Sequence, residues 1–261
     1  MVKDAIGIID LGLEGFQIAK TISENLKHER IVYINDLEYE SYLNISDNEL
    51  IKIIKRNIAL LLENNLKLLI VVSDMIVDRA ASLLLDLKVP SVNIIETLVN
   101  YANLNYEQKN FILLAKEEIL RANLYQKNIK YNRLYNIASD ELEAVIRDKM
   151  VKTSRSFYTI RENFKSVLKK EIDLIITSTP NLVKLKIEMK EYLNFEEITD
   201  LGEILLNRLK HEKLVELNIK GRGVFFVYST LPKKEFRKLV AVNKFKYKQI
   251  KNEKESGKVN G

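Results

Sequence analysis

Apolar residues recur along the chain in two alternating patterns. Short runs rich in isoleucine, leucine and valine are typical of buried strands, whereas longer stretches with apolar residues every three or four positions are typical of amphipathic helices. The helix predicted over Asp47–Asn64 has the strongest signal, because Ser46 supplies a capping hydroxyl and Glu49 follows three positions later. Before it, the pattern predicts strands over Ala5–Asp10 and Ile31–Asn35 and a helix over Gly15–Asn25.

The same alternation continues through most of the remaining chain. It predicts strands over Lys67–Val72, Val89–Ile95, Asn110–Leu114, Leu134–Ala138, Ile172–Thr177, Glu197–Thr199 and Gly223–Tyr228. It predicts helices over Ile76–Leu87, Glu117–Lys127, Asp140–Lys170, Leu182–Tyr192 and Gly202–Glu212. Strands that alternate with helices in this way favour an α/β fold with mainly parallel sheets.

A strand, a short turn and a helix follow one another directly at three places. The three strands end at Asp10, Val72 and Thr177. In open parallel sheets, ligands bind in the crevice beyond the carboxyl ends of the strands. We therefore expect the functional site at these three turns.

The turn after the first strand resembles the opening motif of the glutamate racemase family, part of the aspartate/glutamate racemase superfamily. The family motif is Asp-Ser-Gly-x-Gly-Gly. Asp10, Gly12 and Gly15 match it, whereas Leu11 replaces the serine. Further segments resemble the family in the same order and at similar spacing. Among them, residues 33–36 match a Tyr-x-x-Asp strand end, and Tyr42 is the remaining member of a Pro-Tyr-Gly triplet.

The resemblance implies a fold of two pseudo-symmetric α/β domains, whose mainly parallel sheets face a central crevice. We expect the first domain to comprise residues 1–96 with 206–250 and the second to comprise residues 97–205. Residues 251–261 are expected to form a basic, disordered tail.

The two catalytic thiols of the family are missing, because the chain contains no cysteine. The resemblance aligns Asp74 and Ser178 with the two thiol positions and Pro180 with the histidine near the second one. An aspartate has a reference pKa about 4 units below that of a thiol, so it is a poor base for a carbon acid. A serine hydroxyl hardly ionises without an adjacent general base.

Side chains that hold the amino-acid substrate in the family have changed as well. The resemblance places Leu11, Met75 and Ile76 at positions where family members donate or accept hydrogen bonds. These apolar side chains would leave the charges of a zwitterionic glutamate unpaired, at a cost of several kcal/mol. We therefore expect a catalytically inactive racemase-like protein that serves as a binding or regulatory scaffold. A pocket filled by these three side chains would support that expectation.

Candidate pocket residues follow from the strand-end turns and the resemblance. They are Asp10, Leu11, Tyr42, Asp74, Met75, Ile76, Ser178 and Thr179. One alternative is a working enzyme, either an amino-acid racemase that supplies D-glutamate for peptidoglycan or an enzyme of related carboxylate chemistry that uses Asp10, Asp74 and Ser178. Its ligand would be a small carboxylate. For Tyr33 and Tyr125 we expect packing roles, and for Arg121 a surface position.

No metal site or cofactor is expected, because no thiolate is available and His28 and His211 are too far apart in sequence for a local metal motif. No apolar run approaches the roughly 18 residues of a membrane span, so no membrane association is expected and a cytoplasmic location is the default. A homodimer is an open expectation.

Charge is distributed unevenly along the chain. The net charge is +6, and the segment from Lys233 onward holds ten Lys and Arg against three Glu. Everything before that segment is nearly neutral. A solvated basic terminus is the simplest interpretation, and a second alternative function is binding of nucleic acid or of a DNA-associated protein through this terminus.

Overall fold

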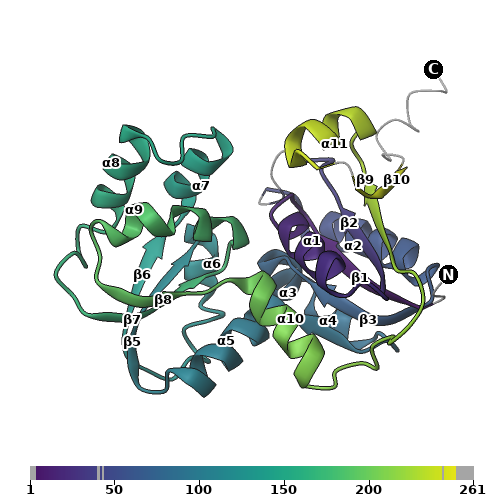
Figure 1. The fold of residues 1–261 in the computed structure, drawn as a ribbon, viewed down its shortest axis with the longest axis horizontal. Coiled ribbons are helices and arrows are strands. Elements are labelled where there is room, and N and C mark those ends of the chain that lie inside the picture. Colours follow the sequence, from purple (N-terminus) through teal and green to yellow (C-terminus); the bar gives the residue numbers. More distant parts are fainter. Residues whose placement is uncertain (1–3, 40–41, 43, 243, 251–261) are drawn as a thin grey trace. The chain divides into compact units, whose positions relative to one another are not determined.

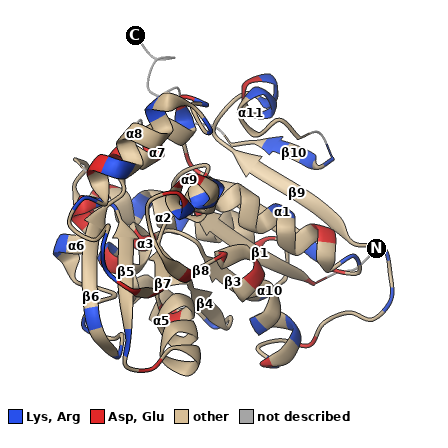
Figure 2. Cartoon of the chain, turned by 60° about the vertical axis from the view of Figure 1, so that its left-hand side comes forward, with Lys and Arg blue, Asp and Glu red and all other residues tan. Residues whose placement is uncertain are grey.

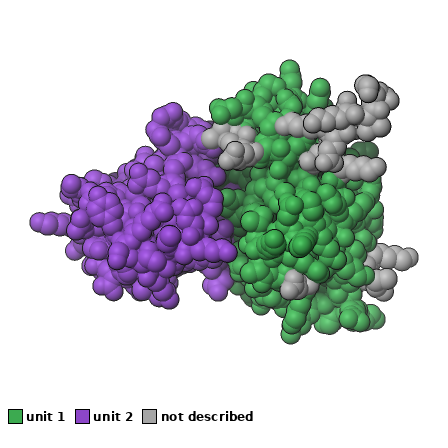
Figure 3. All heavy atoms as spheres, turned by 90° about the horizontal axis from the view of Figure 1, so that it is seen from above, with its two compact units in different colours: residues 1–93, 206–261 green, residues 94–205 purple. Residues whose placement is uncertain are grey.

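The computed structural model describes residues 4–39, 42, 44–242 and 244–250. The chain forms two compact units, residues 1–93 with 206–261 and residues 94–205 (Figure 3). Each unit has its own sheet, its own helices and its own core (Figure 1). The second division, after residue 205, falls within helix α10, Leu201–His211.

The first unit is built on a six-stranded sheet in the order β10-β9-β2-β1-β3-β4, in which every pair is parallel. Its strands are β1 Ala5–Asp10, β2 Arg30–Asn35, β3 Leu66–Val71, β4 Ser91–Asn93, β9 Val224–Ser229 and β10 Lys246–Gln249. Its helices are α1 Gly15–Asn25, α2 Asp47–Leu62, α3 Asp74–Arg79, α4 Ala81–Leu85 and α11 Lys233–Val240.

Both faces of the central strands are covered, and for that reason β1 is buried along its whole length. On one face, the Tyr33 ring of β2 packs against Phe16 of α1, with 5.8 Å between ring centroids. On the other face, Ile9 and Ile34 belong to the core cluster that contains the apolar side of α2. Helix α2 starts where the sequence predicts, because the Ser46 hydroxyl accepts a hydrogen bond from the Glu49 N–H.

The second unit has a four-stranded, fully parallel sheet in the order β6-β5-β7-β8. Its strands are β5 Lys109–Ala115, β6 Tyr131–Ala138, β7 Ile172–Thr177 and β8 Phe195–Ile198. Its helical segments are α5 Ile94–Asn105, α6 Glu117–Ala122, α7 Asp140–Arg147, α8 Ser154–Asn163, the 3-10 helix η1 Pro180–Leu185 and α9 Lys186–Lys190. Helices α7 and α8 pack with η1 and α9 over a core that includes Ile112 and Phe164.

The prediction of an α/β fold with parallel sheets is confirmed, and several element boundaries are wrong. The helix predicted over Asp140–Lys170 is two helices, because Lys149 and Lys152 adopt the left-handed backbone region with φ of 59° each. The strand predicted over Val89–Ile95 spans only Ser91–Asn93, and Ile94 already begins α5. The proposed tail of residues 251–261 lies outside the described residues. No helix in the described part of the chain is long and apolar enough to cross a membrane.

Candidate functional site at the strand ends

The turn between β1 and α1 is held together by the carboxylate of Asp10. Its Oδ1 accepts the Gly12 N–H at 3.1 Å and its Oδ2 accepts the Gly15 N–H at 2.9 Å. The Tyr33 hydroxyl donates to the same Oδ2 at 3.0 Å. Asp10 is only 3% exposed, so its two oxygens point into the turn and are used there. The residue ties the loop together as a structural acceptor.

Burial changes the acidity of this carboxyl group. Loss of solvation, followed by the nearby charge of Glu14, raises the Asp10 pKa from its ordinary value near 3.8 to about 7. The hydrogen bonds from Gly15, Tyr33 and Leu11 act in the opposite direction. Burial, and then the Asp10 charge, also raise the pKa of Tyr33 well above its ordinary value. The Tyr33 hydroxyl therefore stays protonated as a donor.

Glycine is required at position 15 because the turn is packed tightly. A Cβ there would lie 2.3 Å from Cγ2 of Val72 and 2.8 Å from Oδ2 of Asp10. The turn carbonyl of Gly12 is satisfied too, since it accepts from the Tyr33 hydroxyl and from Nδ2 of Asn35, each at 3.1 Å. The Asp10 oxygens and the Gly12 carbonyl of the β1–α1 turn therefore all have hydrogen-bond partners within the turn or on β2.

The turn between β3 and α3 differs in character. Asp74, which the sequence resemblance aligns with a family thiol, is partly exposed at the first position of α3, and Asp78 is exposed. Ile76 is fully buried in the core of the first unit, and Met75 packs against that core. Leu11 from the β1–α1 turn packs against the same core.

Tyr42 takes part in a buried network beyond the end of β2. Its hydroxyl donates to Oδ1 of Asp36, and Oδ2 of Asp36 accepts from Asn57 at 3.0 Å and from Arg56. Arg56 also contacts Glu38 at 3.3 Å. Burial and the Asp36 charge raise the pKa of Tyr42, so this hydroxyl remains a donor to Asp36. Tyr42 has a structural partner inside its own unit.

In the second unit, polar side chains gather where β5, β6 and β7 end. Glu143 accepts the hydroxyl of Ser139 at 2.6 Å and that of Thr179 at 2.8 Å, and Lys116 lies 3.4 Å away. Ser178 is 3% exposed, and its backbone N–H donates to the Leu114 carbonyl. Its hydroxyl has no hydrogen-bonded base among the described residues.

The candidate residues therefore fall into two sets. Asp10, Leu11, Tyr42, Asp74, Met75 and Ile76 belong to the first unit, and Ser178 and Thr179 belong to the second. Sequence patterns did not single out Arg56 or Glu143, since a lone charged residue on a helix gives no signal that it will be drawn into a polar cluster. Of the remaining predictions, Tyr125 is fully buried, and Arg121 is exposed and paired with Glu117.

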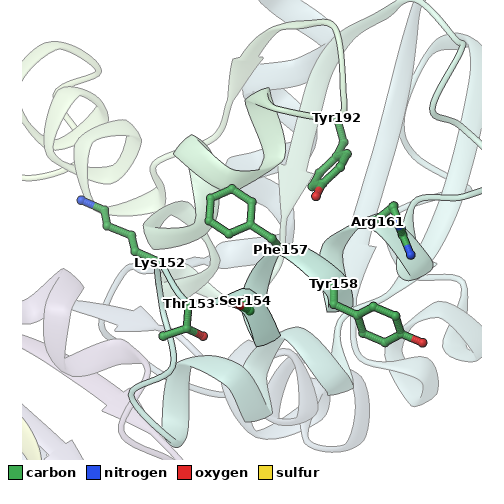
Figure 4. A pocket seen from close by; sticks show the side chains of 7 residues that line it. All are labelled: Lys152, Thr153, Ser154, Phe157, Tyr158, Arg161 and Tyr192. Carbon is green, nitrogen blue, oxygen red and sulfur yellow. The ribbon is translucent and has the colours of Figure 1, made fainter.

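A surface hollow of about 490 Å³ lies elsewhere on the second unit, beside α8 (Figure 4). It is lined by Lys152, Thr153, Ser154, Phe157, Tyr158, Arg161 and Tyr192. No residue of the candidate site lines it. In the described part of the chain, no three His, Asp or Glu side chains are grouped as a metal site would require.

The two-unit structure matches solved structures that share one fold. Glutamate racemase from Thermus thermophilus in complex with beta-chloro-D-alanine matches with a TM-score of 0.83 at 18% identity, over 96% of this chain and 98% of that one. An aspartate racemase from Picrophilus torridus matches with a TM-score of 0.59 at 14% identity, over 83% and 96% of the two chains. The fold is that of the aspartate and glutamate racemases.

Among these two kinds of racemase, the proteins with similar sequences are glutamate racemases. Glutamate racemase from Lactobacillus acidophilus is 24% identical over 201 residues, 75% of each chain. That from Fusobacterium nucleatum is 23% identical over 235 residues, 85% of this chain and 88% of that protein. No protein-family model matches. The chain is therefore similar in sequence and in fold to glutamate racemases along most of its length, and its sequence contains no cysteine.

Proposed function

We propose that this protein is a glutamate racemase-like pseudoenzyme whose scaffold serves in binding or regulation. The observation that carries the proposal is the complete absence of cysteine. The family resemblance implies a reaction in which two thiols remove and return the α-proton on opposite faces of the substrate. Neither thiol exists in this chain.

The residues at the two thiol positions are poor replacements. An aspartate such as Asp74 is ordinarily about 4 pKa units more acidic than a thiol, which makes it a weak base toward a carbon acid. Ser178 would need a neighbouring base, but Pro180 follows in place of the family's histidine and Glu143 is engaged by Ser139 and Thr179. Proton transfer is thus impaired on both faces of the substrate.

Substrate holding is impaired for a separate reason. Leu11, Met75 and Ile76 stand where the family has polar side chains, and all three pack into or against the core of the first unit. None of these side chains can pair with the ammonium or carboxylate groups of an amino acid. We propose that free glutamate binds weakly and that the ligand, a small carboxylate or a protein partner, differs from that of the enzymes.

A working enzyme is the alternative, and the acidity of one buried carboxyl group favours it. The Asp10 pKa of about 7 lies in the range suited to a general base at neutral pH. Both Asp10 oxygens, however, already accept hydrogen bonds from the β1–α1 turn and Tyr33. An active racemase of this family would act in the cytoplasm to supply D-glutamate for peptidoglycan.

Exchange of the α-proton in deuterated water separates the two functions. D- and L-glutamate are incubated with the wild-type protein, with Asp74→Ala and with Asp10→Asn, and the α-proton signal is followed by NMR. We expect no exchange above the protein-free rate in any sample. Exchange by the wild type that disappears in Asp74→Ala would overturn the proposal. A thermal-shift screen with dicarboxylates and divalent metals then searches for the ligand.

A further inference from the structure

The positive charge of the protein is concentrated at one edge of the first unit. Residues 233–250 contain seven Lys and Arg and a single Glu, a net charge of +6 that equals the net charge of the whole chain. Helix α11 and strand β10 contact each other at the end of the sheet, where both are marked by basic residues (Figure 2). We call this surface the basic edge; it consists of Lys233, Lys234, Arg237, Lys238, Lys244, Lys246 and Lys248.

The cations of the basic edge lie on both faces of the sheet. Lys246 and Lys248 extend over the rings of Phe226 and Tyr228 on β9, at 5.3 and 5.1 Å from the ring centroids. The intervening Tyr247 packs on the opposite face, 5.4 Å from the Phe236 ring of α11. Since side chains of a strand alternate, the helix and the strand present lysines on either side of one sheet edge.

The six lysines of the basic edge are available to an external partner. All six are exposed, and none forms an ion pair with a residue in the described part of the chain. The one acidic residue among them is Glu235. Like charges gathered around a single counter-charge repel one another, and that cost is relieved when a polyanion binds.

We propose that the basic edge binds the phosphate backbone of double-stranded nucleic acid without sequence preference. Lysine ammonium groups suit phosphate contacts, which add affinity but carry no sequence information. This inference goes beyond the proposed loss of racemase chemistry and does not depend on it, because no candidate site residue is part of the basic edge.

The aromatic residues of the basic edge favour a duplex over a single strand. Single-stranded nucleic acid is held largely by bases that stack on accessible aromatic rings. Here Phe236 is fully buried, and the Phe245 and Tyr247 rings are half-buried and pack on each other with 6.2 Å between centroids. Arg237 stacks over Phe245 at 6.0 Å, so it is held away from a base-reading role.

The test is fluorescence anisotropy with a labelled DNA duplex of mixed sequence and the full-length protein. Four or five phosphate contacts predict that raising the salt from about 50 to about 200 mM weakens binding more than about 100-fold. A second duplex of unrelated sequence is expected to bind equally well. No binding of either duplex at the lower salt would overturn the proposal.

Two variants with equal loss of charge locate the binding surface. The edge variant replaces five basic-edge lysines with glutamine: Lys233, Lys234, Lys238, Lys246 and Lys248. The control variant replaces five exposed lysines elsewhere with glutamine: Lys52, Lys55, Lys127, Lys169 and Lys170. We expect the edge variant to lose about 100-fold in affinity and most of the salt dependence, and the control to change less than about threefold. Equal losses in both would contradict a localised surface.

Two further samples distinguish duplex binding from protection of the sheet edge and from lipid binding. A variant with only Lys233→Gln, Lys234→Gln and Lys238→Gln leaves β10 and its ring contacts intact, and it is still expected to weaken binding at least tenfold. If only variants that include Lys246 and Lys248 fail, and they also aggregate, those lysines protect a sheet edge and the proposal is wrong. Vesicles of phosphatidylglycerol are expected to compete poorly with DNA; binding to vesicles but not to duplex would likewise refute it.

Discussion

Two neighbouring turns in the first unit, after β1 and after β3, differ in how their polar side chains are buried and paired. The β1–α1 turn keeps the family's aspartate and glycines, and its carboxylate is buried with three hydrogen bonds. The β3–α3 turn, where the resemblance places a family thiol, carries the partly exposed Asp74 followed by Met75 and Ile76 packed on the core. The residues that match the family motif are those that build the β1–α1 turn, and the residues that differ are those to which the resemblance assigns chemistry.

The largest expected effect comes from removing the buried carboxylate. Asp10→Ala leaves the N–H groups of Gly12 and Gly15 without their acceptor and removes one of the two acceptors of the Tyr33 hydroxyl. We expect a loss of about 3 kcal/mol in the free energy of unfolding near pH 6. Asp74→Ala, the matched variant in the other turn, is expected to cost about 0.5 kcal/mol. Urea unfolding of both variants measures the difference. Losses of similar size would mean that the two turns do not differ as described.

A glycine exchange tests the packing of the retained turn. Gly15→Ala places a methyl group 2.3 Å from Val72 and should cost about 2.5 kcal/mol, because the surrounding core cannot relax fully. Gly12→Ala meets only the flexible end of Glu14, and we expect less than about 1 kcal/mol. Val72→Ala is expected to recover part of the Gly15→Ala loss in a double-mutant cycle followed by thermal melting. Strict additivity would show that the close approach is unimportant.

The raised pKa of Asp10 predicts a pH dependence with a definite sign. Its carboxyl titrates near 7 in the folded protein and near 4 when unfolded, so between these values the folded state binds more protons. Stability from this group is complete below about pH 4 and is lost as the pH rises through about 7. Relative to Asp10→Asn, the wild type should lose on the order of 2 kcal/mol between about pH 5 and about pH 8. A gain over the same interval would contradict the assignment.

The smallest expected losses of stability are those of two variants in the second unit. Thr179→Val removes a hydrogen bond to Glu143 and is expected to cost about 1 kcal/mol, whereas Ser178→Ala should cost less than about 0.5 kcal/mol. Chemical denaturation with a probe in this unit measures both. A larger loss for Ser178→Ala would indicate a partner for its hydroxyl and would revive a catalytic role.

The sequence predicts most of the strands and helices and little of how the side chains of the candidate site are paired. The strands over Ala5–Asp10 and Ile172–Thr177 and the Ser46 cap are local patterns, and all three match the structure. The break between α7 and α8 depends on left-handed backbone at Lys149 and Lys152, residues that carry no glycine-like signal. The Asp10–Tyr33 hydrogen bond and the Asp36–Arg56 contact depend on side chains brought together from separate elements. Such long-range packing has no signature in sequence spacing.

We propose that the whole site, and not only its thiols, differs from that of the glutamate racemases. The most direct measurement is a chiral assay of D- to L-glutamate conversion by the variant Asp74→Cys/Ser178→Cys, with an active glutamate racemase assayed in parallel. Since Leu11, Met75, Ile76 and Pro180 remain, we predict a folded protein with no conversion above background. Clear racemisation by the two-cysteine variant would contradict the account, because it would show that the substrate site had survived and that the thiols alone were lost.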